Sequence, residues 1–219
     1  LSTVGRMAAG MAHEINNPLE GMSNYLVLAR EALARQQLDE AQRCLAKVRE
    51  GLDRAAGVVR QVLAHADPAH APAALVDLVP TILQTVEFVR SRPEFKSIRF
   101  EVDLPEALSP IRGRPVMLGQ VFLNLLLNAC EAQPDGGEVT VTGDATGGFV
   151  HVEISDRGPG IPKADADRIF EPFYTTKRST GLGLSICHSI VREHGGEISA
   201  VNRKEGGASF KLRFPAGPA

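Results

Sequence analysis

The chain has 219 residues, with 24 Lys and Arg against 26 Asp and Glu, so its formal net charge is −2. This balance leaves no basic excess to neutralise a nucleic-acid backbone, and with no Trp and two Tyr a base-stacking surface is not expected either. No run of about 18 apolar residues occurs, so no membrane contact is expected within this stretch. Cys44, Cys130 and Cys187 lack CxxC spacing, which favours reduced thiols in a cytoplasmic protein. Because the sequence begins at Leu1, we expect a preceding sensor region that could tether it.

Residues 66–74 carry two prolines among small side chains, a composition that cannot continue a helix and buries little. We therefore expect a first domain over 1–67, a linker over 68–74 and a second domain over 75–219. The two domains differ in the periodicity of their apolar residues rather than in charge.

The first domain has the apolar pattern of two helices, with spacings that alternate between four and three residues. Residues 36–39 can form a tight turn between them, with Asp39 as the N-cap of the second helix. A two-helix hairpin cannot enclose a core, so we expect two chains to form a four-helix bundle, as a homodimer. The repeating positions are Val4, Ala8, Met11, Ile15, Pro18, Met22, Tyr25, Ala29 and Ala32, followed by Ala41, Leu45, Val48, Leu52, Ala55, Val59, Val62 and Ala66.

The second domain mixes strand and helix patterns. Its antiparallel hairpins, joined through residues 144–148 and 202–207, predict an α+β fold in which helices cover one face of a mixed sheet. Strands are expected at 98–104, 138–143, 149–155, 196–201 and 208–214, and helices at 79–90, 115–132 and 182–194.

His13 lies on the helix face opposite the apolar stripe. A solvated surface histidine is the ordinary interpretation. However, Pro18 interrupts the same helix at a cost of roughly 3 kcal/mol, with Glu14 adjacent to the imidazole and Asn17 one turn further on. A helix break beside an exposed imidazole indicates a nucleophile that another domain must reach.

Asn124 and Asn128 lie one helical turn apart within a run of leucines. A helix cap or a satisfied buried amide is the ordinary interpretation. Two amides among leucines are costly to bury unless a polar group lies against them. A hydrated Mg²⁺ that carries ATP phosphates is such a group, because Mg²⁺ takes few protein oxygens and keeps its waters.

Five motifs occur in order: Ala12–Leu19 (AHEINNPL), Asn124–Ala129 (NLLLNA), Asp156–Ile161 (DRGPGI), Phe170–Lys177 (FEPFYTTK) and Gly181–Ser185 (GLGLS). In this order and spacing they resemble the H, N, G1, F and G2 boxes of the sensor histidine kinases of two-component signalling. The NNPL and TTK forms look like the nitrogen-regulation and dicarboxylate-sensor branch.

The resemblance implies a fold and an activity. It implies a dimerisation and phosphotransfer hairpin followed by a Bergerat-type α/β sandwich that binds ATP and Mg²⁺. The implied enzyme is a protein-histidine kinase that autophosphorylates at His13 and transfers the phosphoryl group to an Asp of a response regulator, with phosphatase activity toward that regulator in some members.

The resemblance also implies residue roles. Catalysis falls to His13, Glu14 and Asn17. The metal ligand is Asn128, and Asp156 accepts from the adenine amino group. Residues 161–180 form a lid whose base Phe170 and Phe173 pack onto the core. The remaining nucleotide-binding positions are Asn124, Gly158, Gly160, Ile161, Lys177, Arg178, Gly181, Leu182, Gly183 and Ser209.

The sequence departs from the family at Ser179, where a Gly is frequent, and at Glu131, where many members carry Lys. Lys177 and Arg178 are therefore the candidates to meet the phosphate charge. Two rival functions follow. An ATP-hydrolysing machine of the same nucleotide fold would need a Glu at Asn124 to activate water, and an amide cannot take that proton. A dimeric scaffold that binds ATP without phosphotransfer is the alternative that stays open.

Overall fold

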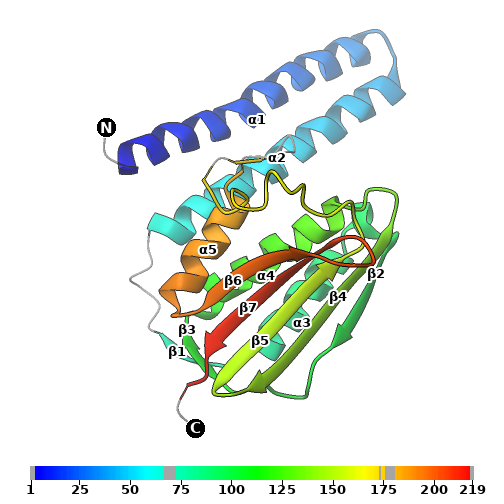
Figure 1. Ribbon diagram of the computed structural model, residues 1–219. Helices are drawn as coiled ribbons and strands as arrows, with labels where there is room; N and C mark the ends of the chain where they lie inside the picture. Colours follow the sequence, from blue (N-terminus) through cyan, green and yellow to red (C-terminus); the bar gives the residue numbers. More distant parts are fainter. Residues whose placement is uncertain (1–2, 67–72, 173, 176–180, 218–219) are drawn as a thin grey trace. The chain divides into compact units, whose positions relative to one another are not determined.

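The computed structural model describes residues 3–66, 73–172, 174–175 and 181–217; within the first two helices, the side chains of residues 3–18, 50, 53–54 and 56–66 lie outside the description (Figure 1). The chain divides into two compact units, residues 1–70 and residues 71–219. No helix of the described residues is long and apolar enough to cross a bilayer.

The first unit is a helical hairpin of α1 (Thr3–Ala34) and α2 (Leu38–Ala66). Gln36 follows the end of α1 with a φ of +59°, and its backbone N–H donates to the carbonyl of Leu33 at 3.0 Å. The predicted N-cap at Asp39 is wrong, because α2 already begins at Leu38 and the Ala41 amide donates to the Gln37 carbonyl. Asp39 instead lies in the first turn, where its charge suits the helix dipole.

Within the apolar stripe of the hairpin, burial depends on residue size. Small members of the stripe are buried between the two helices of one chain, namely Ala29, Ala32, Ala41 and Ala55, together with Met22. Large members are exposed in the single chain, namely Tyr25, Leu45 and Leu52. The alanines let the two helices of one chain approach closely, and the large side chains remain uncovered.

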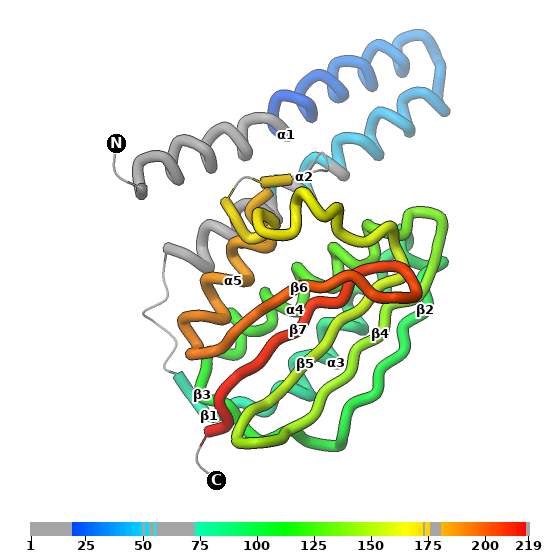
Figure 2. Tube along the Cα trace, viewed as in Figure 1, coloured from blue at the N-terminus to red at the C-terminus, as the bar shows by residue number. Residues whose placement is uncertain are grey.

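The second unit is α+β, as predicted. Its five-stranded sheet runs in the order β2 (Ile98–Asp103), β4 (Gly137–Thr146), β5 (Phe149–Asp156), β7 (Ala208–Pro215) and β6 (Glu197–Asn202). The β2–β4 pair is parallel and the other pairs are antiparallel. Helices α3 (Leu78–Arg90), α4 (Pro115–Glu131) and α5 (Gly183–Glu193) cover one face of this sheet (Figures 1 and 2).

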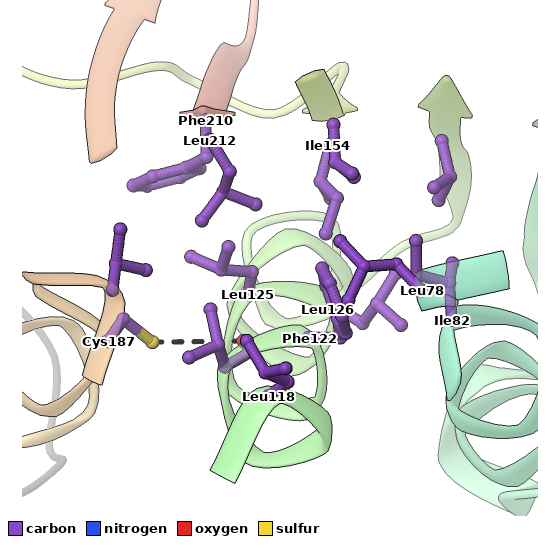
Figure 3. Packing of buried hydrophobic residues seen from close by; sticks show 14 of the residues in the cluster. Leu78, Ile82, Leu118, Phe122, Leu125, Leu126, Ile154, Cys187, Phe210 and Leu212 are labelled. Carbon is purple, nitrogen blue, oxygen red and sulfur yellow. Dashed lines mark hydrogen bonds between the residues drawn. The ribbon is translucent and has the colours of Figure 1, made fainter. Parts of the chain in front are cut away.

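Helix α4 forms the middle of the core. Its Leu118, Phe122, Leu125 and Leu126 are fully buried and point toward the sheet and the two neighbouring helices (Figure 3). They pack with Leu78, Ile82, Ile154, Phe210 and Leu212 from α3, β5 and β7.

Two expectations about local structure are wrong, and two short features were not predicted. A small sheet of β1 (Ala74–Val76) and β3 (Ile111–Gly113), and a 3₁₀ turn at Pro93–Phe95, were not predicted, since three-residue segments carry no periodicity. Ala74 therefore belongs to a strand rather than to the linker. The β4–β5 connection is not residues 144–148 but only Gly147 and Gly148, whose φ values of +59° and +78° suit a two-residue hairpin turn.

Candidate nucleotide-binding site

Asp156 ends β5 with its side chain only 3% exposed. Its Oδ1 accepts hydrogen bonds from the backbone N–H of Gly158 at 2.8 Å and of Ala208 at 3.2 Å. No described residue donates to its other oxygen, Oδ2. A buried carboxylate oxygen without a donor is costly unless a ligand supplies one. Asp156 is thus an acceptor held in place from one side and available on the other.

The two glycines after Asp156 are required by close packing. A Cβ at Gly158 would lie 2.9 Å from both the Cβ and the carbonyl oxygen of Ala132, just past the end of α4. Gly160 has a φ of +77°, and a Cβ there would lie 2.7 Å from Oδ1 of Asn202. The turn that follows Asp156 therefore packs directly against the end of α4, and a side chain at Gly158 would prevent this contact.

Gln133, which the sequence analysis did not select, is the polar centre of this region. It is 5% exposed, and its side-chain amide bonds to backbone groups at the end of α4, at the start of β4 and at Arg157. Asn202 on β6 holds the backbone of Ile161 at the other end of the same turn. A glutamine just after a helix and shortly before Gly136 and Gly137 was the only signal in the sequence.

Asn124 lies on α4 and is 7% exposed. Its Oδ1 accepts from Nε2 of Gln120 at 2.8 Å, and its Nδ2 donates to the carbonyl of Gly183 at 3.3 Å. The structure therefore brings together the second and fifth motifs. Asn128, one turn further along α4, is half-buried.

Helix α5 begins at Gly183, with Leu182 as its N-cap and no side-chain hydrogen bond capping it. A Cβ at Gly183 would meet no atom of the described residues within 4 Å. Gly181 has a φ of +68°, which favours glycine. The backbone N–H groups at the N-terminus of this helix, beside Asn124, are of the kind that can bind an anion.

Ser209 is not brought together with Asp156. Its hydroxyl donates to Glu153, whose carboxylate also pairs with Lys211 at 3.7 Å. Ser209 pairs with Ser155 in the sheet register, and alternation along a strand puts this position on the face opposite Asp156. The backbone N–H of the preceding Ala208 is what reaches the carboxylate.

Several candidate residues fall outside the description. Lys177, Arg178, Ser179 and Phe173 are not described, and neither are the side chains of His13, Glu14 and Asn17, although α1 spans these last three positions. Phe170 is described, and its ring lies 5.7 Å from that of His188 on α5.

The thiols of the second unit are unsuited to nucleophilic chemistry. Burial raises the pKa of both Cys130 and Cys187 to about 12, so both remain protonated near neutral pH. Sγ of Cys187 lies 3.7 Å from the carbonyl oxygen of Val121, within the core (Figure 3).

Two family models match the chain. The His Kinase A (phospho-acceptor) domain matches residues 3–68, and the histidine kinase-, DNA gyrase B- and HSP90-like ATPase matches residues 113–218. The fold and site thus define a helical phosphoacceptor hairpin joined to an ATPase-type nucleotide-binding domain.

Curated relatives extend this similarity over nearly the whole chain. Sensor histidine kinase ZraS of Escherichia coli (strain K12) is 35% identical over 98% of this chain and 46% of ZraS. Sporulation kinase A of Bacillus subtilis (strain 168) is 33% identical over 98% of this chain and 35% of its own length. The chain thus spans about half or less of the length of these relatives.

Solved structures agree. The mycobacterial sensor histidine kinase MprB is 31% identical, with a TM-score of 0.60 over 67% of this chain and 99% of that one. The histidine kinase ThkA in complex with the response regulator TrrA is 26% identical, with a TM-score of 0.73 over all of this chain and 63% of that one. A third, full-length ShkA in complex with AMPPNP, is 26% identical, with a TM-score of 0.68 over 98% of this chain and 47% of that one. This chain belongs to the sensor histidine kinases of two-component signalling.

Proposed function

We propose that the second unit binds ATP with Mg²⁺, that His13 receives the γ-phosphoryl group, and that the phosphohistidine then donates it to an Asp of a response regulator. The observation that carries this proposal is the buried carboxylate of Asp156, which has one oxygen held by two backbone N–H groups and one oxygen without a described donor. Relatives described as bound to AMPPNP and to a response regulator support it.

On the adenine side, Asp156 is the proposed acceptor for the 6-amino group. Its Oδ1 is occupied by Gly158 and Ala208, so Oδ2 is the oxygen that can receive a donor from a ligand. A charged acceptor that is already oriented loses little entropy on binding. The residues present therefore fit an amino-purine at this position.

On the phosphate side, we propose Asn128 as a protein oxygen ligand for Mg²⁺, whose charge would neutralise the phosphates. The N–H groups at the start of α5 supply anion-binding donors, and Asn124 positions that helix end through the Gly183 carbonyl. Lys177 and Arg178, from the proposed lid over residues 161–180, are proposed to add positive charge.

On the hairpin, His13 is the proposed nucleophile. Its imidazole must be neutral at the attacking nitrogen, and Glu14 is placed by sequence to orient and accept from the other N–H as charge develops. Asn17 carries no proton-accepting group, and we propose that its amide orients water during dephosphorylation of the regulator.

We propose that the hairpin dimerises as a four-helix bundle. Leu45 and Leu52 of the apolar stripe are 49% and 58% exposed in the single chain, and Leu26 and Leu33 on α1 are similarly uncovered. Large apolar side chains left open along an alanine-lined hairpin favour a second hairpin as their partner.

Some finer assignments rest on sequence alone. From the NNPL and TTK motifs we propose membership of the nitrogen-regulation and dicarboxylate-sensor branch. We also propose a cytoplasmic site of action.

Incubation of the chain with γ-labelled ATP tests the proposal. We expect acid-labile, alkali-stable label in the parent, and none in His13→Ala, while His13→Ala still binds ATP. Absence of label in a parent that binds ATP would favour the scaffold alternative. Mixing His13→Ala with Asn128→Ala distinguishes phosphorylation within one subunit from phosphorylation between subunits. One variant lacks the acceptor histidine and the other lacks the proposed metal ligand, so label in the mixture requires transfer between subunits.

A further inference from the structure

We infer that Gln133 is a positioning residue for the adenine side of the nucleotide site, an inference that rests on the ATP binding proposed above. Gln133 is 5% exposed and follows α4 by two positions. Gln133 makes no hydrogen bond to a residue that was assigned a role above. It binds the backbone of Arg157, which lies between Asp156 and Gly158.

The amide of Gln133 bonds to four backbone groups. Its Nε2 donates to the carbonyl oxygen of Ala129 at 3.1 Å and to that of Glu138 at 3.2 Å. Its Oε1 accepts from the N–H of Glu138 at 3.0 Å and from that of Arg157 at 3.2 Å. One side chain thus joins the last turn of α4, the start of β4 and the residue that follows Asp156.

The surrounding backbone is shaped to admit this amide. A Cβ at Gly137 would lie 2.0 Å from Oε1 of Gln133 and 2.7 Å from its Cδ, so a larger residue there would displace the amide. On the other side, Gly158 lies against Ala132, immediately before Gln133. The turn after Asp156 is therefore fixed against the end of α4 by a hydrogen bond and by close packing within two residues of each other.

This arrangement couples the two sides of the proposed site. Asn128 lies on the last turn of α4, and Asp156 lies one residue before Arg157, whose N–H Gln133 holds. With Gln133 in place, the carboxylate and the helix end keep a constant separation. Without it, no hydrogen bond of the described residues joins the turn to α4. Asp156 is then held by the sheet and by the N–H groups of Gly158 and Ala208, and it can shift relative to the end of α4.

The chain offers a control for this contact. The side chain of Arg157 is held independently, since its Nε and Nη2 bond to Oε1 of Glu138 at 2.9 and 2.8 Å. Arg157→Ala therefore removes a charged contact at the same residue and leaves its backbone N–H on Gln133.

The test measures ATP affinity, KM for ATP and kcat of autophosphorylation together with the thermal midpoint. Gln133→Met keeps the length of the side chain and removes all four bonds. We expect Kd and KM for ATP to rise about 3- to 10-fold, the scale of a lost buried hydrogen bond, with kcat at saturating ATP near the parent value. Arg157→Ala should bind ATP like the parent.

A second control separates positioning from loss of stability. Val150 is fully buried at the opposite end of β5 from Asp156, so Val150→Ala lowers stability without touching the turn. Should Gln133→Met bind ATP no more weakly than Val150→Ala, the inference is overturned. A parent that binds no ATP would instead overturn the proposed function itself.

Gln133→Glu serves if Gln133→Met does not fold. It keeps the acceptor for the N–H of Arg157 and of Glu138 and loses the donors to the two carbonyls. We expect ATP to bind Gln133→Glu with a Kd within about 3-fold of the parent value, because the bond to Arg157 remains. A loss of ATP affinity about 10-fold or larger in Gln133→Glu, with a thermal midpoint equal to that of Val150→Ala, would contradict the role assigned to that bond.

Discussion

Asn202 holds Ile161 by both of its backbone polar groups. Its Oδ1 accepts from the Ile161 N–H at 2.7 Å, and its Nδ2 donates to the Ile161 carbonyl at 2.7 Å. The two residues are 41 positions apart, so β6 fixes the point at which the chain leaves the turn after Asp156. Gly160, directly before Ile161, is a glycine because a Cβ would collide with the same amide.

Asn202→Ala removes both bonds. We expect hydrogen exchange at the Ile161 amide to accelerate by about 2- to 10-fold, the range that one net hydrogen bond provides, and the thermal midpoint to change little because Asn202 is exposed. Asn202→Asp keeps an acceptor for the N–H and should be intermediate. If the Ile161 amide of Asn202→Ala exchanges at the parent rate, the two hydrogen bonds from Asn202 do not protect this residue.

Asp156→Asn leaves an oxygen to accept from Gly158 and Ala208 but can present an amide donor to the ligand. We expect ATP affinity to fall by about 1.5–3 kcal/mol, the range for hydrogen bonds to charged groups, with little loss of stability. Calorimetric titration with ATP measures it. If Asp156→Asn binds ATP with the dissociation constant of the parent, Asp156 does not contact the nucleotide.

Asn128→Asp changes the charge of the proposed metal ligand and leaves the adenine side alone. A carboxylate oxygen holds Mg²⁺ more strongly than an amide oxygen, so the Mg²⁺ concentration for half-maximal autophosphorylation should fall. ATP affinity measured without metal should fall, because the new carboxylate then faces the phosphates with no cation between them. Identical Mg²⁺ dependence at saturating ATP would show that Asn128 is not a ligand.

Glu14 and Asn17 flank one histidine and are expected to serve opposite reactions. Glu14→Gln should depress autophosphorylation by ~10²–10⁴-fold, the usual contribution of a general base, with ATP binding intact. Asn17→Ala should spare autophosphorylation and slow dephosphorylation of the partner regulator. The reverse pattern for Asn17→Ala, with kinase activity lost and phosphatase activity kept, would contradict this division.

The raised pKa of the Cys187 thiol implies that the stability of the folded protein depends on pH. Burial raises its pKa to about 12, whereas an unfolded cysteine ionises near 8.5. Below pH ~8.5 the thiol is protonated in both states and contributes no slope. Above it the unfolded state releases a proton that the folded state keeps, so stability should fall by up to about 1.4 kcal/mol per pH unit. Urea unfolding at several pH values measures this.

Cys187→Ala is the control for that slope. It should be less stable than the parent at pH 7, because a buried group is lost, yet lose stability less steeply between pH 8.5 and 10.5. Equal slopes in parent and variant would mean that the thiol ionises within the folded protein.

Local patterns determined much of this protein. The alternating apolar spacings of residues 4–32 and 39–66 predicted α1 and α2, and runs of strand-forming residues predicted the long strands, because these patterns depend only on local backbone geometry. Short motifs likewise identified the family, since glycines, Asp156 and the paired asparagines are needed at particular spacings for one kind of chemistry.

Tertiary structure alone decided which groups meet. Asn124 and Gly183 are 59 positions apart, and Gln133 and Arg157 are 24 apart, so no local pattern links either pair. Ser209 shows the converse: one step along β7 turns its hydroxyl to Glu153 and leaves the N–H of Ala208 on Asp156. Strand alternation and register, which arise only when the sheet assembles, determine which of two neighbouring residues faces the site.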